Sequence, residues 1–283
     1  MVNVKRYKSK TDDVKRDNIF ITEYPSIGDF TTDINSLPEN EFFKSRTSSS
    51  HRVENSDNGW AMSRDYAKAE HLLIHGWDTA AEKMSKKVKV TSTTNATVRT
   101  SRPQFGVVGS QASVPRYLQG IPTNMVSRNM TYSKQKVVTI TKGISYSGWW
   151  TSEAILEESI KALQIIQSLE SAGKRVRLNV MVASSNSRDT KHTICKVCVK
   201  QPDERLNISK MSFALAHPAM LRRFFFRWME TDPFVNFDIG GGYGSPSRLS
   251  IRKTAMAENE YYIPEKITDM DKVIEQIQNG EMR

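Results

Sequence analysis

The segment Lys136–Leu178 constrains the fold of this chain more than any other. It begins with the β-branched run Val137–Thr141 and continues into a short loop, Gly143–Gly148. An amphipathic stretch over residues 152–172 follows, and a second apolar run starts at Val176. β-Branched runs favour strands, whereas apolar residues three and four apart favour a helix. The segment therefore predicts one strand–loop–helix–strand unit.

The predicted helix of residues 152–172 has a regular apolar face. Its members recur at helical spacing and form the expected buried stripe: Leu156, Ile160, Leu163, Ile166 and Leu169. Two strands are expected at 176–183 and 193–200, joined by a hairpin loop at 184–189. Further helices are expected at 63–75, 77–84, 115–120, 209–216, 218–230 and 270–278. Residues 85–104 read as an exposed loop or a weak strand pair.

Residues 137–183 resemble the opening of the von Willebrand factor A (vWA) domain. In that family an Asp-x-Ser-x-Ser motif at a helix mouth holds Mg²⁺ through carboxylate and hydroxyl oxygens. Ser145 and Ser147 fall on the two serine positions, whereas Gly143 takes the aspartate position. Two neutral hydroxyls cannot replace the carboxylate that Mg²⁺ requires. We therefore expect a metal-free loop at the N-terminus of the helix, which contacts an anion or a partner. A generic strand–turn–helix is the alternative.

We expect an α/β protein with a vWA-like or Rossmann-like core sheet flanked by helices, with a small helical N-terminal region and a flexible arm. The arm is polar and basic and covers residues 1–58, where the Ile19–Ile21 run orders only in an assembly. Residues 59–130 form the small helical region with loops. Residues 131–283 form the vWA-like core with a C-terminal extension.

The charge of the chain favours polyanionic partners. It has 41 Lys and Arg against 31 Asp and Glu, a net charge of +10. Such a balance indicates nucleic acid first, with plain solubility as the alternative. No stretch approaches the roughly 20 apolar residues of a membrane span, so we expect a soluble protein with no membrane partner.

The two cysteines, Cys195 and Cys198, are spaced as C-x-x-C within a predicted strand. Residues three apart in a strand point to opposite faces, and zinc would need a second pair. We therefore expect reduced thiols, no metal and no cofactor. The histidines form no ligand cluster, and no nucleophile–base–acid set is apparent, so catalytic residues are not expected and an enzyme is disfavoured.

Several side chains besides the serines are candidates for partner or anion binding. They come from three segments, namely an aromatic pair, a helix with alternating basic and aromatic residues, and a Gly-rich loop: Trp149, Trp150, Arg222, Arg223, Arg227 and Arg248. For the helix that contains Leu221–Met229, the favoured interpretation is core packing with a solvated basic rim. For the loop Asp238–Arg248, it is a flexible connector.

Three groups of segments together resemble an uncharacterised family of tailed-bacteriophage proteins. They are Trp60–Trp77, Val114–Met125, and Leu169–Leu178 with Phe213–Arg223. The resemblance implies a phage origin and a location in the host bacterial cytoplasm or the virion. We expect a non-enzymatic protein that binds nucleic acid or another phage protein in genome handling or virion assembly. The alternatives are a self-assembling virion or scaffold component and, more weakly, an enzyme acting on nucleotides.

Overall fold

The computed structural model describes residues 2–9, 18–43, 49–88, 97–134, 136–239 and 243–279. The chain divides into two units. Met1–Ser92 and Val137–Arg283 form the main unit, and Thr93–Lys136 forms a separate unit that we call the hairpin insert.

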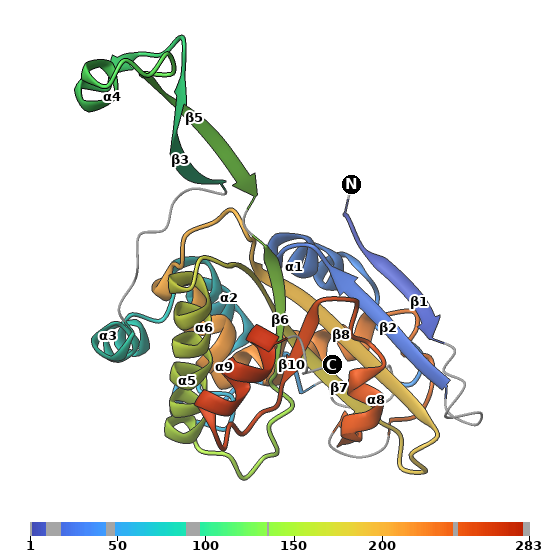
Figure 1. Ribbon diagram of the computed structural model, residues 1–283. Helices are drawn as coiled ribbons and strands as arrows, with labels where there is room; N and C mark the ends of the chain where they lie inside the picture. The colour runs from blue at the N-terminus through green and yellow to red at the C-terminus, as the bar shows by residue number, and fades with distance from the viewer. Residues whose placement is uncertain are drawn as a thin grey trace. The chain divides into compact units, whose positions relative to one another are not determined.

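The main unit is built on a seven-stranded mixed sheet with the order β1-β2-β8-β7-β6-β10, and β9 pairs with β7 (Figure 1). The pairs β2/β8, β7/β6 and β6/β10 are parallel, whereas β1/β2, β7/β8 and β7/β9 are antiparallel. This arrangement confirms the expected α/β class with a helix-flanked sheet. The strands are β1 (Lys5–Ser9), β2 (Asn18–Tyr24), β6 (Val137–Gly143), β7 (Arg175–Ser185), β8 (Lys191–Lys200), β9 (Ser245–Pro246) and β10 (Glu260–Ile263).

Helices cover one face of this sheet. Alternate residues of β7, namely Val176, Leu178 and Val180, point to this face and are fully buried with the helices. The predicted stripe of the long helix α5 is buried as expected. The helical elements are α1 (Ile27–Ser36), α2 (Tyr66–His75), α3 (Asp78–Lys87), α5 (Ser152–Ser171), α6 (Ile208–Ala216), the π-helical segment η1 (Met220–Phe225), α7 (Phe226–Thr231) and α9 (Met270–Asn279).

The opposite face of the sheet has an apolar half and a polar half. Ile19, Ile21 and Met181 lie in the apolar half and pack against Ile251 of the short helix α8 (Leu249–Lys253). The polar half carries charged and amide side chains from β2, β7, β8 and β10, and threonine hydroxyls from β6. A polar half on the inner strands of a sheet is unusual, because such strands are mostly buried on both faces.

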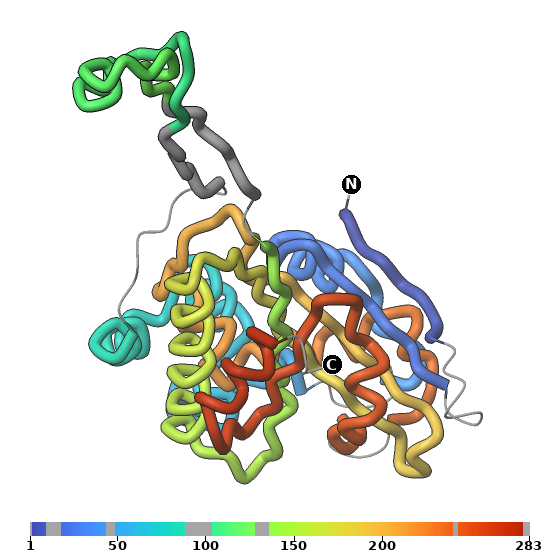
Figure 2. Tube along the Cα trace, viewed as in Figure 1, coloured from blue at the N-terminus to red at the C-terminus, as the bar shows by residue number. Residues whose placement is uncertain are grey.

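The prediction of a flexible N-terminal arm over residues 1–58 is wrong for β1, β2 and α1, whereas residues 10–17 and 44–48 lie outside the described residues. β1 and β2 extend the main sheet beside β8 (Figure 2), and α1 follows directly. Ile19 and Ile21 are fully buried without any assembly partner. Arg6 fixes β1 in place, since its Nε donates to Asp232 Oδ2 at 3.0 Å. Asn18–Tyr24 alternates in burial, but the strand it pairs with lies far along the chain.

The prediction of one small helical region over residues 59–130 is wrong, because the hairpin insert begins within it. Only α2 and α3 of that region are in the main unit. The remainder belongs to a three-stranded sheet of β3 (Thr97–Gly106), β5 (Met125–Lys134) and β4 (Gln111–Ala112), with the short helix α4 (Val114–Leu118). β3 and β5 pair antiparallel over their full length, from Thr97↔Lys134 to Gly106↔Met125.

Two predicted helices differ in detail from the observed ones. The helix expected from Ser63 begins at Tyr66, because the side chain of Asp65 caps it by accepting from the Lys68 N–H at 2.8 Å. It ends before Gly76, as expected, with φ of 90° at that glycine. The helix expected at 218–230 is interrupted by η1, and π-helical turns of this kind are frequent at functional sites.

Cys195 and Cys198 lie on β8, as predicted, and point to opposite faces of the sheet. Both thiols are free and buried. Burial raises the pKa of the Cys195 thiol well above its usual value, so the protonated thiol is the stable form.

Candidate functional site

A pocket of about 190 Å³ lies where β6 and β7 end, at the start of α5. These strands are parallel, and ligands of open α/β sheets bind beyond the carboxyl ends of such strands. We call it the mouth pocket. Its walls include two of the predicted serines and one predicted arginine: Trp60, Ser145, Ser147, Arg222, Phe226 and Tyr243.

The two serines of the mouth have different environments. Ser145 is buried, and its Oγ accepts from the Ala183 N–H of β7 at 3.0 Å. Ser147 is exposed. The hydroxyl of Ser145 therefore ties the loop after β6 to β7, whereas that of Ser147 is open to a ligand.

A carboxylate reaches this mouth from a distant part of the chain. Glu265 follows β10, and its Oε1 accepts from the Ser145 N–H at 3.2 Å. Arg252 holds both oxygens, because its Nη1 lies 2.7 Å from each. The guanidinium of Arg252 thus occupies the side of Glu265 at which a metal ion would have to bind. Sequence reasoning missed Glu265 because β10, which places it beside β6, was not predicted.

The aspartate of the vWA motif has no room in this fold. A Cβ added to Gly143 would lie 2.3 Å from Tyr262 Oη and 2.9 Å from Glu265 Oε1. Both distances are shorter than a non-bonded carbon–oxygen contact, so the side chains of Tyr262 and Glu265 would have to shift to admit any other residue here. Within the described residues, no group of three or more His, Cys, Asp or Glu side chains is arranged to hold a metal ion.

Arg222 brings an unmatched positive charge to the mouth pocket. The residue is only 5% exposed. Its Nη1 donates to the Trp60 carbonyl, its Cζ lies 4.8 Å from the centre of the Trp60 ring, and its Nη2 has no hydrogen-bond partner in the described part of the chain. Burial lowers the pKa of Arg222, and the charge of the Glu54 carboxylate offsets this only in part. Among the described residues, the guanidinium therefore has no ion-pair partner.

Two stacked aromatic rings form another wall of the mouth pocket. Phe226 and Tyr243 stack with ring centres 3.8 Å apart and an angle of 5° between the ring planes. Tyr243 adopts φ of 65° and Gly244 φ of 80°, a turn that lets β9 pair with the end of β7. This part of the Gly-rich loop therefore forms a wall of the pocket. The sequence had predicted a flexible connector here and gave no sign of this role. Residues 240–242 lie outside the described residues.

The expectation of a solvated basic rim on the Leu221–Met229 helix is wrong. Arg223 is fully buried, and its guanidinium donates to the backbone carbonyls of Ser50 at 3.0 Å and Ser63 at 2.7 Å, and to that of Arg52. It holds the segment before α2 against η1. Polar atoms of a turn-rich segment need such partners once they are buried. The sequence predicted a solvated surface for these arginines, because the segment before α2 is far from them along the chain.

The other predicted binding residues do not join the mouth pocket. Arg227 donates to Glu39 Oε1 at 2.9 Å, and Arg248 pairs with Asp189 at 2.9 Å on the surface. Trp150 packs on Tyr146 with ring centres 5.0 Å apart. Trp149, in contrast, is 93% exposed and directly follows Gly148, which lines the pocket.

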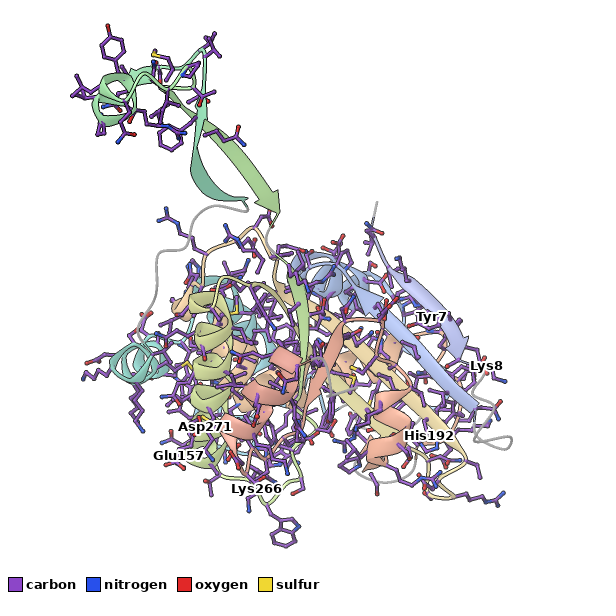
Figure 3. All side chains as sticks on the ribbon, viewed as in Figure 1. Tyr7, Lys8, Glu157, His192, Lys266 and Asp271 are labelled. Atoms are coloured by element: carbon purple, nitrogen blue, oxygen red, sulfur yellow. The ribbon has the colours of Figure 1, made fainter. Side chains whose placement is uncertain are left out.

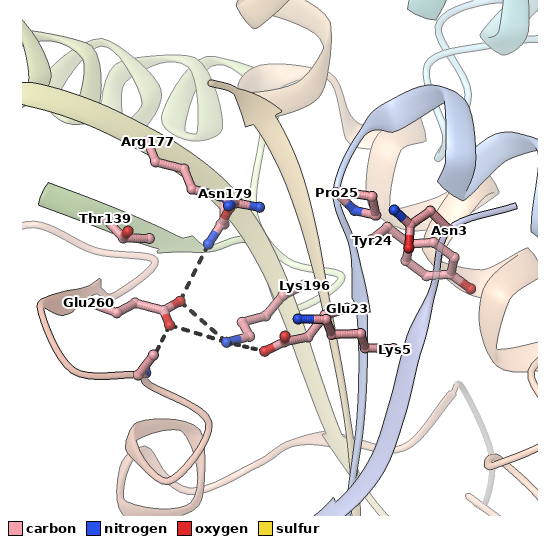
Figure 4. A pocket seen from close by; sticks show the side chains of 11 residues that line it. Asn3, Lys5, Glu23, Tyr24, Pro25, Thr139, Arg177, Asn179, Lys196 and Glu260 are labelled. Carbon is pink, nitrogen blue, oxygen red and sulfur yellow. Dashed lines mark hydrogen bonds and ion pairs between the residues drawn. The ribbon is translucent and has the colours of Figure 1, made fainter. Parts of the chain in front are cut away.

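A second cavity of about 350 Å³ lies on the polar half of the sheet (Figure 4). Its charges are largely paired with one another. Lys196 donates to Glu23 Oε1 at 2.5 Å and to Glu260 Oε2 at 3.2 Å. Glu260 also accepts from Asn179 Nδ2 at 3.4 Å, and Tyr7 of β1 (Figure 3) donates to Glu23 at 3.0 Å. This network links five strands, which favours a structural role.

The fold and the mouth pocket define a mixed-sheet α/β protein with a buried arginine, without an ion pair among the described residues, at the carboxyl ends of two parallel strands. The chain belongs to the family of the domain of unknown function DUF7192, whose family model matches residues 5–280. The comparisons with curated proteins and with solved structures gave no match. Among the helices of the described residues, none has both the length and the apolar character required to cross a bilayer.

Proposed function

We propose that this chain is a non-enzymatic nucleic-acid-binding protein whose mouth pocket takes a phosphate group against Arg222. The observation that carries the proposal is the 5% exposed guanidinium of Arg222, which forms no ion pair among the described residues and feels the charge of Glu54 without a direct contact. A buried cation without an opposite charge is costly, and an entering anion stabilises it. At about 190 Å³, or about six waters at roughly 30 Å³ each, the pocket has room for a phosphate group and more.

The aromatic side chains around the mouth pocket favour nucleic acid over a simple inorganic anion. Trp149 is 93% exposed, so its ring is open to a partner, whereas Trp60 is 45% exposed with Arg222 over its ring. Every base has a π-face that can stack on an aromatic side chain. The net charge of +10 adds a long-range attraction for the phosphate backbone.

The resemblance to a tailed-phage family supports a role in phage genome handling or virion assembly. The protein would then act in the bacterial host cytoplasm or within the virion. Nucleic acid is handled at both places, so this context agrees with the partner that the mouth pocket favours.

The proposal is tested by equilibrium binding of a labelled, 5′-phosphorylated single strand to three variants. Arg222→Gln removes the pocket charge, and Arg205→Gln is the matched control, because Arg205 is exposed and lines no part of the pocket. Loss of one charge-assisted contact of about 1.5–3 kcal/mol predicts at least tenfold weaker binding for Arg222→Gln. An equal loss of binding affinity in the two variants would show that Arg222 does not bind the phosphate.

Trp149→Ala gives a second, independent readout. Its removal predicts a loss of about 1–3 kcal/mol for a stacked base, with little change in thermal stability because the side chain is exposed. Unchanged affinity would show that base stacking at this tryptophan plays no part.

A further inference from the structure

The hairpin insert carries most of the excess charge of this protein. Thr93–Lys136 contains no Asp or Glu and has six basic residues: Arg99, Arg102, Arg116, Arg128, Lys134 and Lys136. These six charges leave a net charge of +4 for the rest of the chain, out of a total of +10. A segment with basic residues and no carboxylate forms no internal ion pairs, so its charge is available to a partner.

The shape of the insert fits a groove of double-stranded nucleic acid. β3 and β5 are paired over ten residues each, which at about 3.4 Å per residue gives a ribbon of roughly 34 Å. The major groove of DNA is about 12 Å wide and admits a two-stranded β-ribbon. One helical turn of the duplex is about 34–36 Å long along its axis, and the groove itself follows a longer winding path, so the ribbon can reach phosphates over part of a turn.

The tip of the ribbon is apolar and exposed. Val107 is 71% exposed, Val108 84% and Leu118 78%. Beside them, the guanidinium of Arg116 stacks on Phe105, with Cζ 4.1 Å from the ring centre. Proteins that bend DNA use apolar wedges of this kind against base steps, while basic residues hold the phosphates.

We infer that the hairpin insert is a duplex-binding arm, in which the β3–β5 ribbon contacts phosphates along a groove and the apolar tip contacts bases. This inference rests on the proposed nucleic-acid function, but not on the mouth pocket, which lies in the main unit. Charge complementarity favours duplex nucleic acid as the partner of the hairpin insert. An apolar partner surface would not need six basic residues, and a basic partner surface would be repelled.

The test is the salt dependence of binding to a labelled duplex of about two helical turns. The ribbon variant carries Arg99→Gln, Arg102→Gln, Arg128→Gln and Lys134→Gln. The matched control removes four exposed charges from the main unit: Lys68→Gln, Lys87→Gln, Lys253→Gln and Lys266→Gln. At about 0.9 per phosphate contact, the ribbon variant should flatten the slope of log K against log salt by up to about 3.6. The control should change it far less.

A tip variant, Val107→Ser with Val108→Ser, separates the two parts of the arm. It should weaken duplex binding while the salt slope stays the same, because apolar contacts release no counterions. An unchanged affinity would overturn the base-contact role of the tip. All variants should keep the phosphate binding of the mouth pocket, which reports that the main unit is folded.

Equal salt slopes for the ribbon variant and the control would overturn the arm, even if the wild type binds duplex tightly. That outcome leaves the proposed function standing with the main unit as the binding surface. A wild type that binds single strands through Arg222 but no duplex would overturn the arm alone. A wild type that binds no nucleic acid at all would instead contradict the proposed function. Capture of an acidic protein by the ribbon, in place of duplex, would assign the insert to a protein partner.

Discussion

Replacement of Gly143 by alanine tests how the mouth of this fold is packed. The added Cβ would lie 2.3 Å from Tyr262 Oη, 2.9 Å from Glu265 Oε1 and 3.0 Å from Tyr262 Cζ. Gly143 is not among the residues with positive φ, so the expected effect comes from crowding and not from backbone strain. Overpacking of this kind costs about 1–3 kcal/mol. We expect Gly143→Ala to lower the free energy of unfolding by that amount.

A double-mutant cycle with Tyr262→Phe separates crowding from a general effect. Tyr262→Phe alone loses the hydrogen bond between Arg252 Nη1 and Tyr262 Oη, 2.8 Å long, which costs about 1.5–3 kcal/mol for a charged donor. It also removes the atom closest to the new Cβ, so Gly143→Ala should cost at least about 1 kcal/mol less in that background. Urea unfolding followed by circular dichroism measures all four proteins. Additive effects, or a fully stable Gly143→Ala, would refute the packing argument.

Gly143→Asp extends this test to the metal chemistry of the vWA motif. The new carboxylate would crowd Glu265, whose oxygens Arg252 already holds at 2.7 Å. We expect lower stability and no rise in melting temperature on addition of Mg²⁺. A Mg²⁺-dependent rise would show that the mouth can rearrange into a metal site.

Three further predictions concern buried polar groups. Arg223→Met should cost about 3–5 kcal/mol in urea unfolding because it orphans several buried carbonyls, whereas the exposed Arg205→Met should change stability by less than about 0.5 kcal/mol. Lys196→Met should cost about 3–5 kcal/mol, and adding Glu260→Gln should recover part of it, because the unpaired charge is removed. Burial lowers the pKa of His217 to about 4, and its Nδ1 accepts from the Ala219 N–H. The native ring therefore stays neutral while the unfolded chain binds a proton below about pH 6.5, so stability falls by up to about 3 kcal/mol between pH 6.5 and 4. His217→Asn should flatten that fall in urea titrations, and an unchanged pH profile would assign it to other groups.

The local parts of the fold were accessible from the sequence. The stripe of α5 and the β-branched run of β6 lie within one continuous segment, so periodicity alone located both. The hairpin of β7 and β8 was predicted for the same reason. Each of these elements is long enough for its pattern to stand out.

The parts that depend on distant pairing were not accessible. β2 is stabilised by β8, which follows it by more than 150 residues, and its polar flanks suggested a flexible arm. Glu265 meets Ser145 only because β10 pairs with β6. Arg222 was named as a candidate from its charge, but its burial without an ion pair among the described residues depends on which side chains the fold gathers around it. Non-local contacts leave no periodic signal in the segment that makes them.

The most direct test of the central claim is the affinity of the wild-type chain for DNA and RNA, measured over a series of salt concentrations. A protein that neutralises several phosphates loses affinity steeply, with a slope of about 0.9 per contact on duplex DNA. The account predicts binding at low salt that weakens in this linear manner. No binding at low salt, or binding that salt does not change, would contradict it.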